Sequence, residues 1–299
     1  MARLSRGTRE TIKTILFIVA VLILVLIYVV YPLNRTKAFM ARPDIDELPA
    51  DSILLANDIT PFVEAGFKAD SFRVESDGLT KLAAVMIAPL DSLPRGLAIL
   101  IPDERQNRNQ MIPLARAFVD SGFAVATYDQ RASGGSSGRY HSDGQYEAAD
   151  LQAVIADLEI HGRMAHPLVV VGYSAGADAA LLTAIEEKRI DALAAVEPYL
   201  TSDRMFDKVK QTTSHIWYPF HRTMFWWWYN IRSSYAAECR DIDQLRAPTR
   251  KTFLHVAPER QDDPAVRKLV ESAPELISLR PVTGTEQELV GSLLELTRR

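Results

Sequence analysis

The chain has 299 residues, of which 47% are hydrophobic and 24% are charged, which is the composition of a protein with an ordinary core. Its formal net charge of -4 gives no electrostatic basis for binding nucleic acid. Cys239 is the single cysteine, which excludes a disulfide within one chain and argues against a cysteine-based metal site. We expect no cofactor and no metal, because the sequence contains no motif for nucleotides or metal ions.

The N-terminal region contains a long apolar segment. No charged residue occurs from Thr14 to Asn34, and residues Ile15 to Val30 form an unbroken apolar run. A helix needs about 20 such residues to cross a bilayer, whereas the apolar core of a cleaved signal peptide has about 7–15 and precedes small residues. The residues 38–40 (Ala-Phe-Met) make a poor cleavage site. We therefore predict an uncleaved transmembrane anchor over residues 14–34.

The charges beside this segment bear on its orientation. Four basic residues lie in the tail of residues 1–13, which favours a cytoplasmic N-terminus, although three more lie in residues 35–42 and act against it. We predict a cytoplasmic tail over 1–13 and a single pass through the inner, cytoplasmic membrane. The remaining body would then lie on the extracytoplasmic side, with the membrane as its partner and no nucleic acid.

The rest of the chain divides into a connector and a domain. Several prolines among scattered acidic residues make 35–66 an irregular connector or a small helical stalk, followed by a domain over 67–299. In that domain, apolar or β-like runs alternate with helical patterns, which predicts a doubly wound, mostly parallel α/β sheet with helices on both faces. The expected strands are 71–75, 83–88, 96–101, 124–128, 168–171, 192–196, 252–256 and 276–279, and the expected helices are 111–121, 146–159, 175–187 and 286–296.

One segment, residues 201–241, interrupts the alternation and is rich in aromatic residues, including the run Trp226-Trp227-Trp228-Tyr229. We interpret it as a helical insertion over the C-terminal edge of the sheet. Two roles are open for its rings. Tryptophan and tyrosine favour the bilayer interface, so a tethered protein could use them to take up lipid. We favour the alternative that the rings are buried over the sheet edge, because aromatic side chains mostly serve burial.

The strongest motif is Gly172-Tyr173-Ser174-Ala175-Gly176, which follows the apolar run 168–171 and precedes an alanine-rich helical pattern. A serine in a sharp strand-to-helix turn has strained backbone geometry, and small residues on both sides let the turn close. Its Oγ then projects from the edge of the sheet, beside a helix N-terminus that favours developing negative charge. The sequence therefore predicts Ser174 as a nucleophile and the Ala175 N–H as an oxyanion donor.

With this motif, the stretch from about Phe72 to Arg299 resembles the α/β-hydrolase superfamily, most closely the branch of serine peptidases, monoglyceride lipases and similar acyl hydrolases. A second motif supports the resemblance. Residues 128–138 (Tyr-Asp-Gln-Arg-Ala-Ser-Gly-Gly-Ser-Ser-Gly) match the Asp-x-Arg-Gly-x-Gly-x-Ser-x-Gly loop of that family, with Ala132 in place of one glycine. The resemblance implies an α/β-hydrolase fold, with the insertion at 201–241 in the position of the family's lid.

The catalytic equipment that the resemblance implies is only partly present. The family places its catalytic histidine after the last strand, and residues 281–286 (Pro-Val-Thr-Gly-Thr-Glu) contain none. The acid that orients this histidine is assigned to Asp263, with Glu259 and Glu197 as open alternatives. Relatives carry His-Gly after the third strand, whereas this chain has Pro-Asp-Glu-Arg at 102–105. Proline has no N–H to donate, and a carboxylate there opposes an oxyanion unless Arg105 neutralises it.

No histidine of the sequence replaces the missing one in an obvious way. His255 lies inside an expected strand, where a packing role is favoured. His161 and His166 precede the strand that leads to Ser174 and should therefore lie at the opposite edge of the sheet. His141 follows the glycine-rich loop and is expected on the surface. The two histidines of the insertion could reach Ser174 from above; they are His215 and His221.

Two classes of function remain from the sequence. The first is a membrane-anchored serine hydrolase that acts on an ester, lipid or peptide acyl group with the help of an unusual base. The second is a catalytically inactive α/β-hydrolase-like protein that uses the fold for binding or scaffolding in the cell envelope. The intact serine motif favours the hydrolase, whereas the missing histidine and the loop at 102–105 favour the inactive protein.

Overall fold

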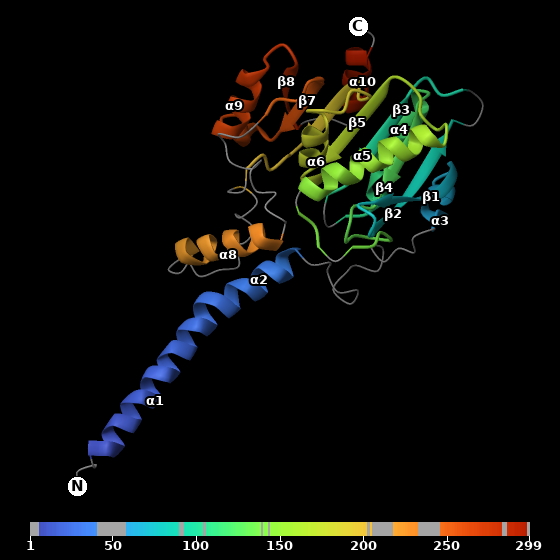
Figure 1. The fold of residues 1–299 in the computed structure, drawn as a ribbon. Helices are drawn as coiled ribbons and strands as arrows, with labels where there is room; N and C mark the ends of the chain where they lie inside the picture. The colour runs from blue at the N-terminus through green and yellow to red at the C-terminus, as the bar shows by residue number, and fades with distance from the viewer. Residues whose placement is uncertain are drawn as a thin grey trace. The chain divides into compact units, whose positions relative to one another are not determined.

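The computed structural model describes residues 6–40, 58–89, 93–103, 106–138, 140–142, 144–201, 204, 218–232, 246–282 and 286–297. The chain divides into two compact units, and each is described by itself. One comprises Met1–Met40 with Phe206–Tyr235, and the other comprises Ala41–Met205 with Ala236–Arg299. The larger unit holds the sheet and Ser174, while the described residues of the smaller unit form helices (Figure 1).

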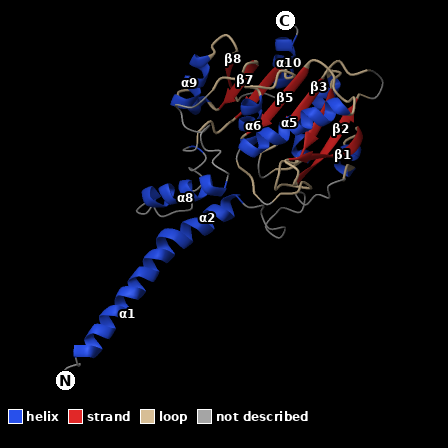
Figure 2. Cartoon of the chain, in the orientation of Figure 1, coloured by secondary structure: helices blue, strands red, loops and turns tan. Residues whose placement is uncertain are grey.

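The larger unit is built on one eight-stranded sheet with the order β1-β2-β4-β3-β5-β6-β7-β8 (Figure 2). Its first strands form an antiparallel hairpin, and β2 also pairs antiparallel with β4, while all later pairs are parallel. The strands are β1 Lys68–Ser76, β2 Thr80–Ala88, β3 Leu97–Ile101, β4 Ala124–Tyr128, β5 Leu168–Tyr173, β6 Ala192–Val196, β7 Lys251–Val256 and β8 Ile277–Pro281. The predicted mostly parallel sheet is confirmed.

Helices cover both faces of this sheet and enclose two apolar cores. On one face α5 (Gln145–Ile160), α6 (Ala175–Thr183) and α9 (Pro264–Ser272) bury side chains such as Leu158 and Leu269 against the sheet (Figure 1). On the other face α3 (Thr60–Glu64), α4 (Ile112–Asp120), which follows the 3₁₀ turn η4 (Arg108–Met111), and α10 (Glu286–Thr297) bury Phe62, Phe118 and Leu293. Continuous apolar strands are required because both faces are covered.

One of these helices, α9, was not expected from the sequence, and another, α3, lies in the connector of residues 35–66, for which a small helical stalk was one of the two expectations. Helix α9 begins with an Asp263 N-cap and Pro264 in its first turn, which is a recognised helix-start signal. Helix α3 likewise carries Pro61 in its first turn. Conversely, α6 ends at Thr183, one turn before the expected end at residue 187.

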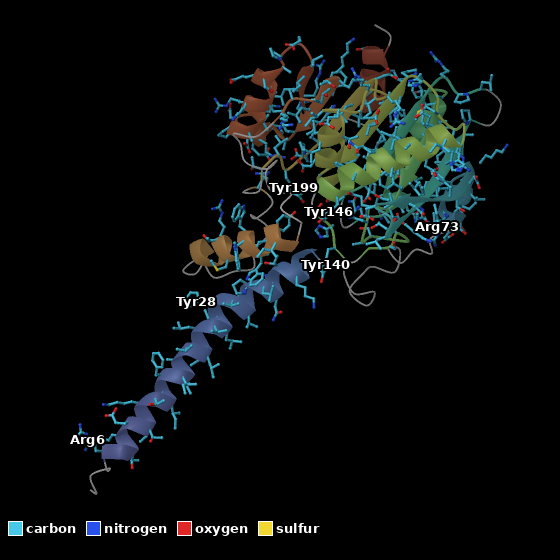
Figure 3. The ribbon with its side chains drawn as sticks, viewed as in Figure 1. Arg6, Tyr28, Arg73, Tyr140, Tyr146 and Tyr199 are labelled. Atoms are coloured by element: carbon cyan, nitrogen blue, oxygen red, sulfur yellow. The ribbon has the colours of Figure 1, made fainter. Side chains whose placement is uncertain are left out.

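The smaller unit contains one long N-terminal helix, divided into α1 (Arg6–Val25), the π-helical turn η1 (Leu26–Val30) and α2 (Tyr31–Met40). Figure 3 labels Arg6 near its start and Tyr28 in η1. The helix is long and apolar enough to cross a membrane, a property that signal sequences share. It continues to Met40, so residues 35–40 of the expected connector are helical. Residues 41–57 of that connector lie outside the described residues, and the domain limits stay a prediction.

The described residues of the aromatic insertion, apart from 201 and 204, form helix α8 (Tyr218–Arg232), which packs against α2 and η1 (Figure 1). Phe225 and Tyr229 are buried and their rings stack at a centroid distance of 6.4 Å. Trp226 and Trp227, in contrast, keep 45% and 49% of their surface exposed. Burial therefore holds for only part of the aromatic cluster. A lid role over the sheet edge stays a prediction.

Candidate active site

Ser174 occupies the junction between β5 and α6 at the carboxyl edge of the sheet. Its backbone angles are φ 52° and ψ −116°, a conformation that residues with a side chain rarely adopt. The Ser174 N–H donates to the carbonyl of Val196 at 2.8 Å, and the Ser174 carbonyl accepts from Ala177 and Asp178 at 3.0 and 3.1 Å. These bonds hold a strained residue between the neighbouring strand and the first turn of the helix.

The two glycines of the motif are required because backbone groups approach them closely. A Cβ atom on Gly172 would lie 2.2 Å from the carbonyl oxygen of Gly176. One on Gly176 would lie 2.6 Å from the carbonyl oxygen of Pro102, at the end of β3. Both distances are far below a van der Waals contact, so any side chain would push α6 away from the sheet. The sharp turn predicted for Ser174 is confirmed in this geometry.

The edge around Ser174 is stabilised by a carboxylate that the sequence did not single out. Asp178, one turn into α6, is buried and accepts from the backbone N–H groups of Tyr199 at 2.9 Å and Leu200 at 3.0 Å. Tyr199 follows β6 and is labelled in Figure 3. Leu200 has a positive φ of 65°, so this bond also holds an unfavourable backbone conformation. Asp178 thus fixes the chain that leaves β6 beside the Ser174 turn.

One oxyanion donor fits the geometry. Ala175 is the first residue of α6, and the first N–H groups of a helix have no partner within the helix. The helix N-terminus also carries a partial positive charge, which favours an oxyanion beside Ser174. The second donor that relatives take from the loop after the third strand cannot come from Pro102, which lacks an N–H. Glu104 and Arg105 of this loop lie outside the described residues.

The loop after β3 is held in place by a residue of the second motif, the glycine-rich loop of residues 128–138. Gln130, which is 1% exposed, donates from its side-chain amide to the carbonyl oxygen of Pro102. The same carbonyl faces the backbone of Gly176. Gln130 therefore links the glycine-rich loop to the loop beside the serine turn. The sequence identified the motif around Gln130 but gave no signal for this contact.

The glycine-rich loop wraps around a buried ion pair. The carboxylate of Asp129 contacts the guanidinium of Arg108 and accepts from the backbone N–H groups of Arg108 and Gly135, both at 2.7 Å. Both charged side chains are fully buried. Burial raises the pKa of Asp129, while Arg108 and the two N–H groups act in the opposite direction. Ala132, which replaces a family glycine, has a φ of 56° that glycine adopts more readily.

A second buried pair anchors the same loop to α5. Arg131 donates two hydrogen bonds to the carboxylate of Asp150, at 2.7 and 2.6 Å, in the planar arrangement that suits a guanidinium. The Arg131 guanidinium also lies 4.8 Å from the ring centroid of Tyr146, which Figure 3 labels. Desolvation raises the pKa of Asp150, and its bonds to Arg131 oppose that effect. The Asp-x-Arg motif is therefore accounted for by structural contacts.

The three candidate acids have separate surroundings. The carboxylate of Asp263 accepts from the N–H of Ala265 at 2.8 Å and caps α9. Glu197 pairs with the buried Arg260 at 2.6 Å and also accepts from the backbone N–H of Ala257. It has a positive φ of 52°. Glu259 is exposed in the short turn after β7. The described contacts give Asp263 and Glu197 structural partners, and the catalytic acid stays a prediction.

The histidines at the other edge of the sheet lie where the sequence placed them. His161 bonds to the carbonyl of Asp157 at 2.9 Å, at the end of α5. His166 contacts the carboxylate of Asp191 at 2.9 Å, just before β5. Because Ser174 lies at the opposite end of β5, neither side chain belongs to its surroundings.

The remaining histidines give one correction. His141 was expected on the surface but is 5% exposed, because the loop that follows the glycine-rich motif folds inward around the buried Glu147 and Ser142. His255 lies in β7 as expected, and burial lowers its pKa. His215 and the side chain of His221 lie outside the described part of the structure.

The family's usual site for the catalytic histidine lies between β8 and α10. The N–H of Val282 donates to the carbonyl of Val256 at 3.1 Å, and α10 begins at Glu286. Burial raises the pKa of Tyr173 to about 12, with a further contribution from the carboxylate of Glu286. Residues 283–285, between β8 and α10, are Thr-Gly-Thr.

An α/β sheet of this order, with a strained serine at the end of β5, defines an α/β-hydrolase. Comparison of the sequence with family models agrees: the model described as serine aminopeptidase, S33 (Hydrolase_4) matches residues 94–281. The match covers more than half of the chain, which therefore belongs to this family. No curated protein matches the sequence significantly.

Solved structures share the fold at low sequence identity. The esterase Pf2001 of Pyrococcus furiosus is 19% identical, with a TM-score of 0.58 over 83% of this chain and 95% of the esterase. The 2,6-dihydroxy-pseudo-oxynicotine hydrolase is 16% identical, with a TM-score of 0.55 over 77% of this chain and 68% of that enzyme. XC6422 of Xanthomonas campestris, described as an α/β serine hydrolase without a lid, is 17% identical, with a TM-score of 0.52 over 77% and 94%.

Proposed function

We propose that this chain is a membrane-anchored serine hydrolase that cleaves an ester, lipid or peptide acyl group. The observation that carries the proposal is the strained backbone of Ser174 at the start of α6, between two glycines whose backbones are in close contact. Such strain costs about 1–3 kcal/mol and persists mainly where function requires it. An inactive binding protein would have no need of this conformation at a serine.

The chemistry that this turn supports is acyl transfer. The Oγ of Ser174 attacks the acyl carbon and loses its proton to a base, and the carbonyl oxygen becomes an oxyanion near the Ala175 N–H and the N-terminus of α6. Collapse of this intermediate expels the alcohol or amine, which takes the proton, and water then hydrolyses the acyl-enzyme. The base must come from outside the family's usual position, and His215 and His221 of the insertion are the candidates.

The acid that orients the base is assigned in this proposal to Asp263, in the loop after β7. Its capping bond to the Ala265 N–H uses one carboxylate oxygen, Oδ1. The second oxygen is chemically able to accept from an imidazole N–H. Glu197, in contrast, engages both oxygens with Ala257 and Arg260, which makes it the weaker choice.

The anchor is the apolar helix of residues 14–34. We propose a single pass through the cytoplasmic membrane, with residues 1–13 on the cytoplasmic side and the hydrolase domain outside. Support comes from the length and exposure of α1, whose described side chains are all solvent-exposed, as those of a lipid-facing helix would be. A cysteine-accessibility assay from either side of sealed vesicles, with a cysteine placed in the tail, tests the orientation.

Labelling with a fluorophosphonate probe tests the hydrolase assignment, because such probes react only with an activated serine. The full-length protein should be labelled, and Ser174→Ala should abolish the labelling. Ser292→Ala is the matched control, because Ser292 is a serine of α10 that bonds only within its own helix among the described contacts. Absence of labelling that depends on Ser174, in protein shown to be folded, would refute the enzymatic assignment.

A second candidate function is an inactive α/β-hydrolase-like protein that binds or scaffolds in the cell envelope. It is favoured by the absence of histidine from residues 281–286 and by Pro102 at the oxyanion loop. The two candidates differ in one measurement. His215→Gln or His221→Gln should sharply reduce labelling of Ser174 if either residue is the base, whereas an inactive protein gives no labelling to reduce.

A further inference from the structure

Helix α8 has one buried face and one exposed aromatic face. Phe225 and Tyr229, one turn apart, are 2% and 3% exposed and lie on the side that packs against α2. Thr36 of α2 is fully buried; its hydroxyl donates to the carbonyl of Pro32 in its own helix at 2.9 Å and lies 3.5 Å from the carbonyl oxygen of Phe225. Trp226 and Trp227, in contrast, are about half exposed, at 45% and 49%. Indole rings are seldom left in water without a reason, because they carry large apolar surfaces.

The contact between α8 and α2 lies at an informative position along the N-terminal helix. The uncharged stretch from Thr14 to Asn34 spans about 30 Å as a helix, which equals the hydrocarbon thickness of a bilayer. Thr36, which contacts α8, lies two residues beyond Asn34. Helix α8 also contacts η1, within the last turns of the uncharged stretch. If the apolar helix spans the membrane, α8 is therefore held at the level of the lipid headgroups.

The composition of the two helices agrees with that level. Neither α2 nor α8 contains an acidic residue, although the chain as a whole has a net charge of -4. Between them they carry four basic residues, which are Arg35, Lys37, Arg222 and Arg232. Tryptophan and tyrosine with arginine and lysine are the residues enriched at a membrane interface, and basic side chains attract anionic headgroups.

We propose that α8 is an interfacial membrane helix, docked on the end of the transmembrane anchor, with Trp226, Trp227 and Ile231 inserted among lipid headgroups. Ile231 is also exposed, at 38%. The occupant of this face is the bilayer surface. The inference rests on the proposed anchor and extends it, because it attaches the insertion between β6 and β7 to the membrane at a second place in the sequence.

Tryptophan fluorescence tests this proposal directly, because all four tryptophans of the chain lie in the insertion, at positions 217, 226, 227 and 228. The full-length protein is reconstituted in vesicles of phosphatidylcholine and phosphatidylglycerol, with or without phosphatidylcholine brominated near the top of its acyl chains. Since an interfacial helix lies about 5–10 Å into the headgroup region, bromine should reduce the emission by roughly half. Unchanged emission would overturn the proposal, whether the rings are open to an aqueous quencher or covered by protein.

A pair of double variants assigns the effect to the exposed face. Trp226→Ser with Trp227→Ser should leave a residual emission that bromine quenches clearly less. The matched control is Leu79→Ser with Leu93→Ser, which removes two leucines of the larger unit that are 89% and 91% exposed and should leave quenching unchanged. Equal residual quenching in the tryptophan variant would contradict the assigned face.

Flotation of the vesicles, repeated after carbonate extraction, separates this proposal from the anchor. Protein that floats but shows no bromine quenching refutes the interfacial helix alone and leaves the anchor in place. Protein that is extracted by carbonate refutes the anchor and, with it, the interfacial helix. The tryptophan variant should float as the wild type does, because α1 is unchanged.

Discussion

The tight contact between Gly172 and Gly176 makes a quantitative prediction. In Gly172→Ala the new Cβ would lie 2.2 Å from the Gly176 carbonyl oxygen and 2.7 Å from the Ala177 nitrogen. Both are backbone atoms, so no side-chain rotation relieves the clash and α6 must move by about 1 Å. Overpacking of a well-packed interior costs about 1–3 kcal/mol and sometimes more, and we expect about 3 kcal/mol here because the obstacle is backbone.

Two other glycines separate this steric effect from backbone effects. A Cβ on Gly78 would meet nothing within 4 Å, but its φ is 72°, so Gly78→Ala should cost about 1–2 kcal/mol from backbone strain alone. Gly291 is inside α10, also with open space, and Gly291→Ala should stabilise the protein by about 0.5–1 kcal/mol. Urea unfolding followed by circular dichroism measures all three. Gly172→Ala with wild-type stability would refute the reasoning.

Three more predictions concern the site. Ser174→Gly should abolish fluorophosphonate labelling yet raise the free energy of unfolding by about 1 kcal/mol, because glycine adopts a φ of 52° without strain. A variant that is no more stable than the wild type in urea unfolding would argue against strain at Ser174. Asp263→Asn should keep the cap of α9 and hence the stability of the protein, whereas Asp263→Ala should lower the free energy of unfolding by about 1 kcal/mol. If Asp263 is the catalytic acid, both variants lose fluorophosphonate labelling, and retained labelling in the Asn variant would exclude Asp263 from the site. Burial lowers the pKa of His255, so the folded state binds fewer protons than the unfolded state. The stability that this residue contributes should be fully present above its ordinary pKa and should be lost as the pH falls through its lowered pKa. His255→Gln should therefore flatten the plot of urea midpoint against pH between pH 7 and 5.

The strands could be predicted from sequence because their environment is uniform. β4 and β6 are buried along their whole length, so a run that is apolar throughout in β6, and apolar apart from Thr127 in β4, marks each strand with its observed limits. The serine turn could be predicted for a different reason. Gly172 and Gly176 are needed by backbone contacts that are local in sequence, so the motif carries its own geometry.

Long-range contacts explain what the sequence did not predict. His141 looks like a polar loop residue, but Glu147 organises its neighbours through bonds to Ser142 and Gly144, which draws the loop inward. Gln130 stands at a variable position of its motif, and its bond to Pro102 joins residues 28 apart. Such contacts have no periodicity for a pattern to show. Helix α9 could have been found, since Asp263 and Pro264 together form a helix-start signal.

The contact between Thr36 and Phe225 joins residues 189 positions apart, and it bears on how the protein can be shortened. A common way to obtain a soluble form of an anchored protein is to delete the N-terminal helix. Here that deletion would also remove α2, the surface that covers Phe225 and Tyr229, and the aromatic insertion would be left with both faces exposed to water. Aggregation of such a truncated chain would therefore say nothing about the hydrolase domain. A soluble form should therefore omit residues 1–40 together with the insertion helix.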